Sequence, residues 1–173
     1  MDWRKLQNGS DIRGVALEGI EGEHVNLTHE VIVTIAKSFV KWLRNTTGHD
    51  APTIAMGMDC RLSGECIKSA FVEGAVEAGA HVVDCGLAST PAMFMTTISE
   101  QVKAQASVMV TASHLPFNRN GLKFFTPKGG LDSKDIAAIL DIAAKGDYAF
   151  DGAAGSSATF DFMSVYSRHL ADY

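Results

Sequence analysis

The sequence has few cysteines and no long hydrophobic run, and both absences narrow what the protein can be. Its 173 residues include three cysteines, Cys60, Cys66 and Cys85, without C-x-x-C spacing. An odd number without that spacing indicates reduced thiols in a cytosolic protein. No apolar stretch approaches the roughly 18 residues of a membrane span, and the N-terminus lacks a secretory signal pattern. We therefore expect a cytoplasmic protein that does not associate with membranes.

Basic clusters and several well-known catalytic motifs are also missing. The 15 Lys and Arg residues are outnumbered by 20 Asp and Glu residues, and the formal net charge is -5. Because no Lys/Arg cluster offsets this charge, the composition argues against a nucleic-acid partner. A few local cations can still hold the phosphate of a small substrate. The Gly-rich stretches match neither the Walker pattern nor G-x-G-x-x-G, and G-x-S-x-G is absent.

What is present is an alternation of strand and helix patterns. Hydrophobic residues make up 46% of the chain, enough for the core of one domain. The opening segment, residues 3–22, is typical of a loop or short hairpin. The patterns predict strands over 53–58, 81–85, 106–110 and 122–125, and helices over 28–45, 63–78, from Thr90-Pro91, and from Asp132-Ser133 to Lys145. They predict a layered α/β fold with a mixed, mostly parallel sheet flanked by helices, whose last two strands pair as a hairpin.

The composition changes near the C-terminus. Residues 151–158, D-G-A-A-G-S-S-A, are typical of a linker. Residues 160–173 then begin a new helical pattern with one apolar face. This division predicts an α/β domain over residues 1–150, followed over 151–173 by a linker and the first helix of an absent second domain. The alternative is a C-terminal helix that packs back on the same core.

Residues 111–123, T-A-S-H-L-P-F-N-R-N-G-L-K, carry the strongest functional signal. Ser113 and His114 follow a buried strand, at the edge where α/β proteins place their sites. A serine needs a base or an electropositive site before it reacts, and adjacent residues on extended chain point to opposite sides, so His114 need not serve Ser113. The small residues, with Lys123 and Arg119 nearby, suit a bound phosphate. The alternative is an ordinary polar loop with a capping serine.

Two further arginines lie in segments suited to anions. Arg13 stands in the Gly-flanked segment S-D-I-R-G, and its planar fork fits a phosphate. Asp59 and Arg61 end a strand before a helix N-terminus, which is also an anion-facing position. The alternative for this second pair is that the two side chains bind each other and shape the loop. Lys123 is either a cation facing a phosphoryl oxygen or a solvent-facing strand lysine.

The pattern T-A-S-H-x-P…N-G-x-K resembles the phosphoserine loop of the α-D-phosphohexomutases, the phosphoglucomutases and phosphomannomutases. Three other segments resemble this family in the same order: N-G-S-D-I-R-G at 8–14, G-M-D-C-R-L-S-G at 57–64, and D-C-G-L-A-S-T-P at 84–91. The resemblance spans residues 8–145 and covers the family's first domain and the entry to its second. Leu115 departs from the Asn of many members, and Met58 from a common Arg.

The resemblance implies a role for each matching residue. Ser113 would carry a phosphoryl group and give it to a hexose 1-phosphate or 6-phosphate; the resulting bisphosphorylated sugar would reorient and return its other phosphate. His114 and Lys123 match positions that contact the transferring group and assist proton transfer, and Arg13 matches an arginine that stabilises it. Three further residues are expected to contact substrate phosphate: Arg61, Asn120 and Arg119.

The resemblance also implies a cofactor and partners. Family members bind Mg²⁺ through the phosphoserine and three aspartates of the second domain; no D-G-D-x-D-R loop occurs here, so Ser113 is the one ligand expected from this chain, through its phosphate. Hexose 1,6-bisphosphate is the expected activator and intermediate. Hexose phosphates and the remaining domains of the same enzyme are the expected partners.

We therefore expect part of an isomerase that is inactive as this chain alone, with mannose, glucose and amino-sugar phosphates all open as substrates. One alternative is a standalone module that binds phosphate or sugar phosphate without turnover. A weaker one is a serine hydrolase, which needs an acidic partner near His114.

Overall fold

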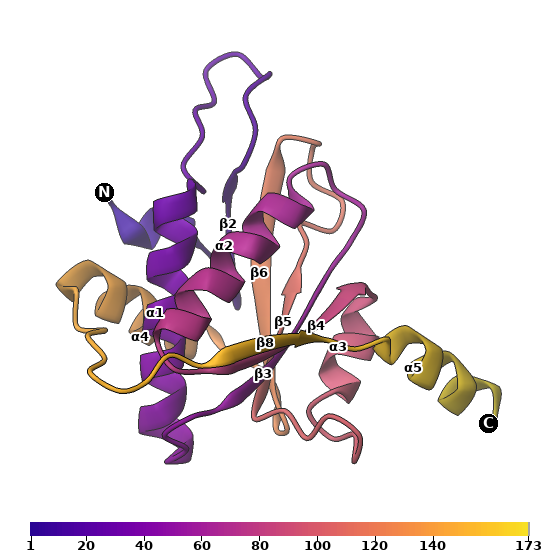
Figure 1. Ribbon diagram of the computed structural model, residues 1–173. Coiled ribbons are helices and arrows are strands. Elements are labelled where there is room, and N and C mark those ends of the chain that lie inside the picture. The colour runs from indigo at the N-terminus through magenta and orange to yellow at the C-terminus, as the bar shows by residue number, and fades with distance from the viewer. Residues whose placement is uncertain (173) are drawn as a thin grey trace.

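One eight-stranded sheet organises the chain in the computed structural model, which describes residues 1–172 (Figure 1). Its strands are β1 (Gln7–Asn8), β2 (Asp11–Val15), β3 (Thr53–Met58), β4 (His81–Leu87), β5 (Ala106–Val110), β6 (Arg119–Thr126), β7 (Gly129–Gly130) and β8 (Ser156–Thr159). The helices are α1 (His29–Thr47), α2 (Gly64–Glu77), α3 (Thr90–Met95), α4 (Ser133–Lys145) and α5 (Phe162–Ala171), and a short 3₁₀ helix covers Trp3–Leu6.

The sheet is mixed, as expected from the sequence. Its strand order is β1-β2-β6-β5-β3-β4-β8, with β7 paired to β6. Parallel pairs join β5, β3, β4 and β8, whereas β1, β2 and β6 pair antiparallel. Strands β5 and β6 form the expected antiparallel pair. The N-terminal hairpin therefore lies beside β6, whose own neighbour β5 leads into the Ser113 segment.

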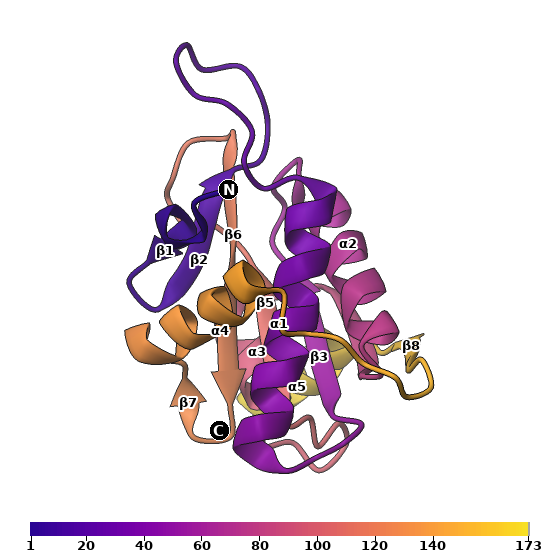
Figure 2. The same cartoon turned by 90° about the vertical axis from the view of Figure 1, so that its left-hand side faces the viewer.

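Helices cover both faces of the sheet and create two cores. Helices α1, α2 and α4 lie on one face, and α3 and α5 lie on the other (Figure 2). The first core includes Phe39, whose ring centroid is 4.6 Å from that of Phe124. The second includes Met93 and Phe125. Because side chains alternate along a strand, the neighbours Phe124 and Phe125 serve opposite cores.

The helix ends follow from local chemistry. Thr28 accepts a hydrogen bond from the Val31 N–H at the start of α1, and Gly48 ends that helix in the left-handed conformation. Asp132 forms a capping box with Asp135 at the start of α4. The start of α1 and both ends of α4 were predicted, whereas α1 ends two residues beyond the predicted Asn45.

The start of α3 differs by one residue from the prediction. The hydroxyl of Ser89, rather than of Thr90, accepts a hydrogen bond from the Ala92 N–H, and Pro91 falls within the first turn. None of the helices in residues 1–172 combines the length and hydropathy needed to cross a bilayer.

Part of the predicted linker is a strand. Ser156–Thr159 forms β8, which pairs in parallel with β4 and extends the sheet. A Cβ on Gly155 would lie 1.8 Å from the Ala80 carbonyl oxygen, so the chain enters β8 too close to its neighbour for any other residue. Helix α5 extends away from the sheet (Figure 1), but its first residue, Phe162, is buried in the second core. That α5 also begins a further domain stays a prediction.

Candidate active site

Ser113 lies three residues beyond the end of β5, in the loop of residues 111–118, hereafter the Ser113 loop. The side chain is exposed, and the backbone has a φ of +51°, in the left-handed region. Its N–H donates to the Thr111 hydroxyl at 3.0 Å. A non-glycine residue in this region is uncommon and strained, and such residues cluster at functional sites. The geometry makes Ser113 the candidate nucleophile.

Arg61 holds the Ser113 loop in shape. Its two terminal nitrogens donate to four carbonyl oxygens at 2.8–2.9 Å, those of Ser113, Leu115, Pro116 and Arg119. Its Nε lies 3.6 Å from a carboxylate oxygen of Asp59. The guanidinium donors are therefore directed at the protein itself. Of the two sequence interpretations of Arg61, the structure shows the pairing with Asp59 that shapes the loop, and contact with a substrate phosphate stays a prediction.

Arg119, another predicted phosphate contact, forms an ion pair with Glu23. Its Nε and Nη2 donate to the two carboxylate oxygens of Glu23 at 3.1 and 2.6 Å, and Asn118 donates to the same carboxylate at 2.7 Å. The bonds from Arg119 and then Asn118 lower the pKa of Glu23 below its ordinary value. Glu23 belongs to the segment of residues 16–28, which Figure 1 shows projecting beyond the sheet. The pair ties this segment to the Ser113 loop.

Asn120, the third predicted contact, is fully buried. Its side-chain nitrogen donates to the Ser63 hydroxyl at 2.9 Å, and its side-chain oxygen accepts from the Gly121 N–H at 2.9 Å. Both ends of the amide are thus used inside the protein, where they connect β6 to the start of α2. The structure does not present Asn120 to a substrate.

Arg13 and Lys123 meet at a shared carboxylate, that of Asp11. Asp11 and Lys123 are cross-strand partners on β2 and β6, and Arg13 lies two residues along β2 on the same face. Asp11 accepts from Arg13 at 2.8 Å through one oxygen and from Lys123 at 3.0 Å through the other. Arg13 also donates to the Ala112 carbonyl oxygen at 3.3 Å, which brings the group to the residue before Ser113. These three side chains are hereafter the Asp11 cluster.

The sequence analysis did not predict Asp11 as the partner of Arg13 and Lys123, or Glu23 as the partner of Arg119. The signal for Asp11 was present, since it stands two residues before Arg13 in a strand-forming segment and therefore on the same face. Glu23 carried no such signal, because its segment has neither helical nor strand periodicity.

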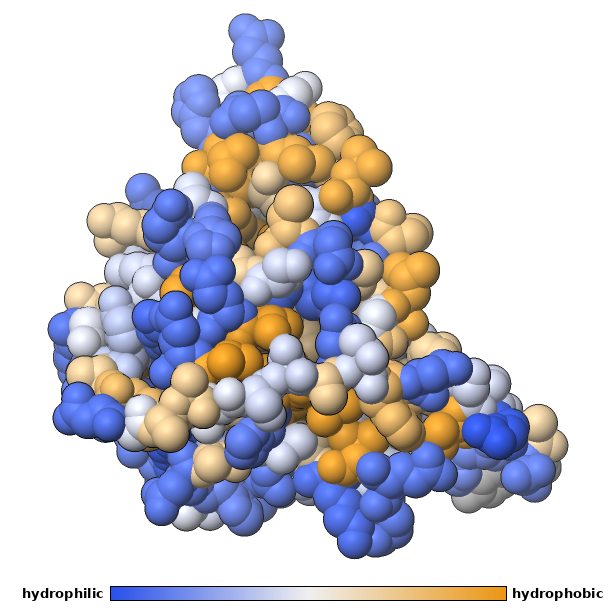
Figure 3. All heavy atoms as spheres, viewed as in Figure 1, coloured by the Kyte–Doolittle hydropathy of each residue, from blue (hydrophilic) through white to orange (hydrophobic). Residues whose placement is uncertain are grey.

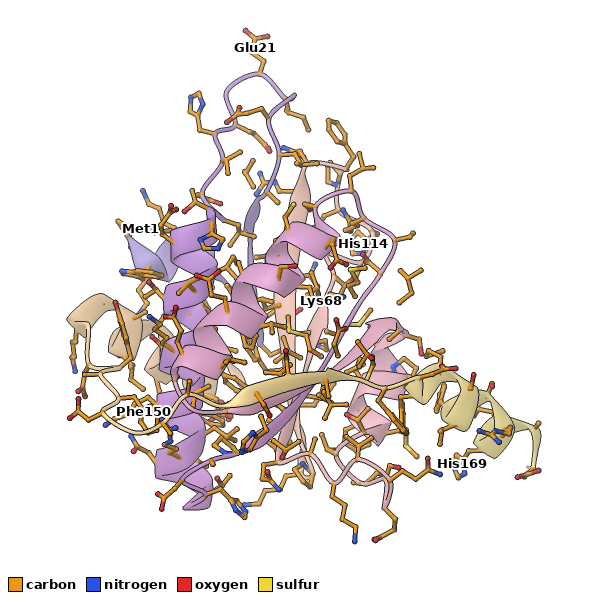
Figure 4. All side chains as sticks on the ribbon, viewed as in Figure 1. Met1, Glu21, Lys68, His114, Phe150 and His169 are labelled. Atoms are coloured by element: carbon orange, nitrogen blue, oxygen red, sulfur yellow. The ribbon has the colours of Figure 1, made fainter. Side chains whose placement is uncertain are left out.

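His114 is the available titratable side chain beside Ser113. It is exposed at the same end of the molecule as the tip of the 16–28 segment, where Figure 4 labels Glu21. No side chain of residues 1–172 forms a hydrogen bond or ion pair with His114.

Comparison with known proteins places this geometry in a family. Residues 4–150 match the family described as phosphoglucomutase/phosphomannomutase, alpha/beta/alpha domain I. The chain belongs to this family. It is 37% identical over 131 residues to a phosphoglucosamine mutase of Streptococcus sanguinis, a match that covers 73% of this chain and 28% of that protein. It is 34% identical over 137 residues to a phosphoglucomutase/phosphomannomutase of Thermococcus kodakarensis, covering 79% and 28%.

Solved structures of the phosphohexomutase family share the fold. A phosphoglucomutase/phosphomannomutase family protein from Burkholderia thailandensis superimposes with a TM-score of 0.78 at 24% identity, covering 95% of this chain and 34% of that one. The chain thus spans about a third of the length of the phosphohexomutases that it matches, which are named as mutases. Residues 4–150 correspond to the first α/β/α domain of that family.

The magnesium site implied by the family resemblance stays an expectation. The described residues contain no group of three His, Cys, Asp or Glu side chains that could hold a metal ion. Mg²⁺ requires several hard oxygen ligands.

Apolar side chains lie around the Ser113 loop. Leu62, which follows Arg61, is 81% exposed, and Phe117 within the Ser113 loop is 54% exposed. Figure 3 shows hydrophobic surface at the end of the molecule that carries these loops. The cations of the Asp11 cluster are therefore set beside a partly apolar surface rather than in a broad basic patch.

Proposed function

We propose that this chain is the phosphoserine-bearing domain of a phosphohexomutase, which moves a phosphoryl group between the 1- and 6-positions of a hexose phosphate. The observation that carries the proposal is Ser113 itself, exposed in a strained left-handed backbone next to the Asp11 cluster. The family match supports the reaction class. The relatives' names, which include phosphoglucosamine mutase, keep amino-sugar phosphates among the candidate substrates.

The proposed transfer starts from phosphorylated Ser113. A hydroxyl oxygen of the sugar phosphate forms a bond to phosphorus as the bond between phosphorus and Ser113 Oγ breaks, and the hydroxyl proton leaves while Oγ gains one. The bisphosphorylated sugar then turns and returns its other phosphoryl group by the reverse step, so the serine ends phosphorylated. Charge neutralisation and positioning dominate such reactions.

Four side chains divide this work in the proposal. Arg13 and Lys123 offset the charge of the phosphoryl oxygens. His114, exposed beside Ser113, exchanges protons with the sugar hydroxyl or the serine oxygen. Arg61 keeps the loop that displays Ser113 in one conformation. Metal ligands besides the phosphoserine, and the groups that choose the sugar, are proposed to lie in other domains of the same protein.

The direct test is to incubate the full-length gene product with glucose 1,6-bisphosphate and Mg²⁺, beside this chain alone, and to measure intact mass and map phosphopeptides. We expect one phosphate on Ser113, none in Ser113→Ala, and unchanged labelling in Ser69→Ala, a matched exposed serine on α2. We expect no mutase turnover from this chain alone. A full-length protein without label at Ser113 would overturn the proposal and favour a sugar-phosphate-binding module.

A further inference from the structure

The Asp11 carboxylate is the ion-pair partner of both Arg13 and Lys123, and Arg13 also donates to the Ala112 carbonyl oxygen in the Ser113 loop. Its side chain is 9% exposed, while those of Arg13 and Lys123 are 15% and 31% exposed. Each oxygen takes one cation, and among residues 1–172 no other carboxylate lies within ion-pair distance of either. The cross-strand register of β2 and β6 fixes this arrangement.

The charges of the cluster do not match those of a phosphoryl group. Arg13 and Lys123 bring two positive charges, and Asp11 cancels one of them. A phosphoserine carries a charge of roughly −1.5 to −2 at neutral pH. When Ser113 is phosphorylated, the phosphoryl oxygens and the Asp11 carboxylate are thus two anionic acceptors for the same pair of cations.

We propose that Asp11 is a positioning residue that acts as an internal counter-ion. In the unphosphorylated chain it holds Arg13 and Lys123 side by side; when Ser113 carries a phosphoryl group, it yields part of their hydrogen bonding to that group. Asp11 therefore limits how tightly the site holds the phosphoryl group. This inference rests on the proposed function, because only a serine that exchanges its phosphoryl group needs such a limit.

The physical reason lies in the difference between binding and transfer. Interactions that are equally strong before and in the transition state do not speed the chemical step. A site with two uncompensated cations would stabilise the phosphoserine itself and so make the group harder to transfer. A fixed carboxylate lowers the affinity of the site for the phosphoserine before transfer. It leaves both cations in position to stabilise the charge that develops on the phosphoryl oxygens during transfer.

The test measures binding of inorganic phosphate to the 173-residue chain by calorimetry at low salt, where surface charges are least screened. We expect Asp11→Asn to bind phosphate about 5-fold more tightly than wild type, since a unit charge is removed a few ångströms from the anion in a partly solvated site. Lys123→Met should bind more weakly. If Asp11 only held the two cations in place, Asp11→Asn would instead bind phosphate more weakly than wild type.

Asp84→Asn is the matched control. Asp84 is also a partly buried strand carboxylate, and it pairs with Lys68 at 2.8 Å outside the Ser113 loop. We expect wild-type phosphate affinity from this variant. Unchanged or weaker binding by folded Asp11→Asn would overturn the inference, as would an equal gain in Asp84→Asn.

A second measurement needs no variant, in case Asp11→Asn does not fold. In wild type, the carboxyl ¹³C resonance of Asp11 should shift as phosphate saturates the chain, because Arg13 and Lys123 turn part of their hydrogen bonding to the anion. Phosphate saturation without a shift of the Asp11 carboxyl resonance would overturn the proposal that Asp11 yields hydrogen bonds to the phosphate. Both experiments use inorganic phosphate, whereas the proposed function is tested by transfer from a bisphosphate, so failure of one is distinguishable from failure of the other.

Discussion

The Ser113 loop owes its shape to a single side chain rather than to regular structure. Arg61 gathers four carbonyl oxygens that would otherwise need water or another donor. Only a guanidinium offers enough N–H groups in a fixed plane to do this, because a lysine ammonium has three donors at one point. The position of Ser113 thus depends on a residue that need not touch the substrate.

Arg61→Lys should lower the free energy of unfolding by about 2 kcal/mol, because most of the charge-assisted bonds to the loop are lost. Urea denaturation measures this change. Arg4→Lys is the control. Arg4 donates to both carboxylate oxygens of Asp141, but its side chain is 53% exposed. Its replacement should therefore lower the free energy of unfolding by less than about 0.5 kcal/mol. Equal losses in the two variants would contradict the role given to Arg61.

The ion pair of Glu23 predicts a pH dependence. The folded-state pKa of Glu23 lies below its ordinary value of 4.5, so the pair contributes stability above that value and loses it as the pH falls through the lower, folded-state value. Wild type should therefore be more stable than Glu23→Gln at pH 7, and this difference should shrink as the pH falls below 4.5.

Denaturation of both proteins from pH 7 to pH 3 measures the difference. Glu21→Gln, at the tip of the same segment, removes a carboxylate that forms no ion pair within residues 1–172 and should show no such trend. A gap between wild type and Glu23→Gln that stays constant with pH would rule the pair out as its source.

The sequence could nominate the charged residues of the site but, apart from the Asp59–Arg61 pair, not their partners. Ser113, Arg13 and Lys123 could be nominated because each stands in a segment that resembles a family motif. The role of Arg119 depends on Glu23, 96 residues away, and that of Arg61 on backbone carbonyls 52–58 residues away. Nothing local distinguishes an arginine that binds phosphate from one that binds its own chain. The candidate residues could therefore be named from the sequence, but their contacts could not.

At the scale of elements, β2 and β6 are brought together by an unusually close contact. A Cβ on Gly121 would lie 2.3 Å from the Ile12 carbonyl oxygen and 2.8 Å from Arg13 Cγ. The same strand pair carries the cross-strand register that creates the Asp11 cluster. The spacing of the cations therefore depends on the absence of a side chain at this position.

Gly121→Ala should separate the two strands and lower the free energy of unfolding by about 1–3 kcal/mol, as overpacking does elsewhere. It should also weaken phosphate binding, since Arg13 is displaced. Thermal denaturation and calorimetry test both effects. Gly130→Ala on β7 has only ordinary contacts at 3.8 Å and should change stability by less than about 0.5 kcal/mol. A Gly121→Ala variant as stable as Gly130→Ala would contradict the close contact.

Elements whose signals are local were predictable, and those defined by pairing were not. Apolar periodicity and capping residues at both ends predict helices α1 and α4 from the sequence. Strand β8 has four exposed residues, S-S-A-T, with no apolar alternation, and it is a strand only because β4 offers an edge. Its glycine- and serine-rich flank was therefore predicted as a linker.

At the scale of the whole molecule, the two cores differ in what closes them. The first is enclosed by three helices and includes Phe39, Phe71 and Phe124. The second lies under the shorter α3 and is completed by Phe162 at the start of α5, only 2% exposed. The C-terminal segment thus contributes to this core whatever else follows it.

Phe162→Ala should lower the free energy of unfolding by about 3 kcal/mol and reduce Tm, because it opens a cavity in the second core. Leu170→Ala on the same helix is the control; its side chain is 54% exposed and should matter little. Thermal unfolding of both variants decides the point. Equal melting temperatures for wild type and Phe162→Ala would show that α5 does not close the second core.

The strand order also determines how late in synthesis β2 can pair with its neighbour in the sheet. Asp11 and Lys123 are cross-strand neighbours yet stand 112 residues apart, so β2 has no partner on its inner side until β6 exists. A ribosome adding 5–20 residues per second needs on the order of ten seconds to make that stretch. During this interval the nascent N-terminal hairpin exposes an unpaired edge, a natural target for chaperones and for aggregation. The two cations of the Asp11 cluster can come together only after most of the domain has been synthesised.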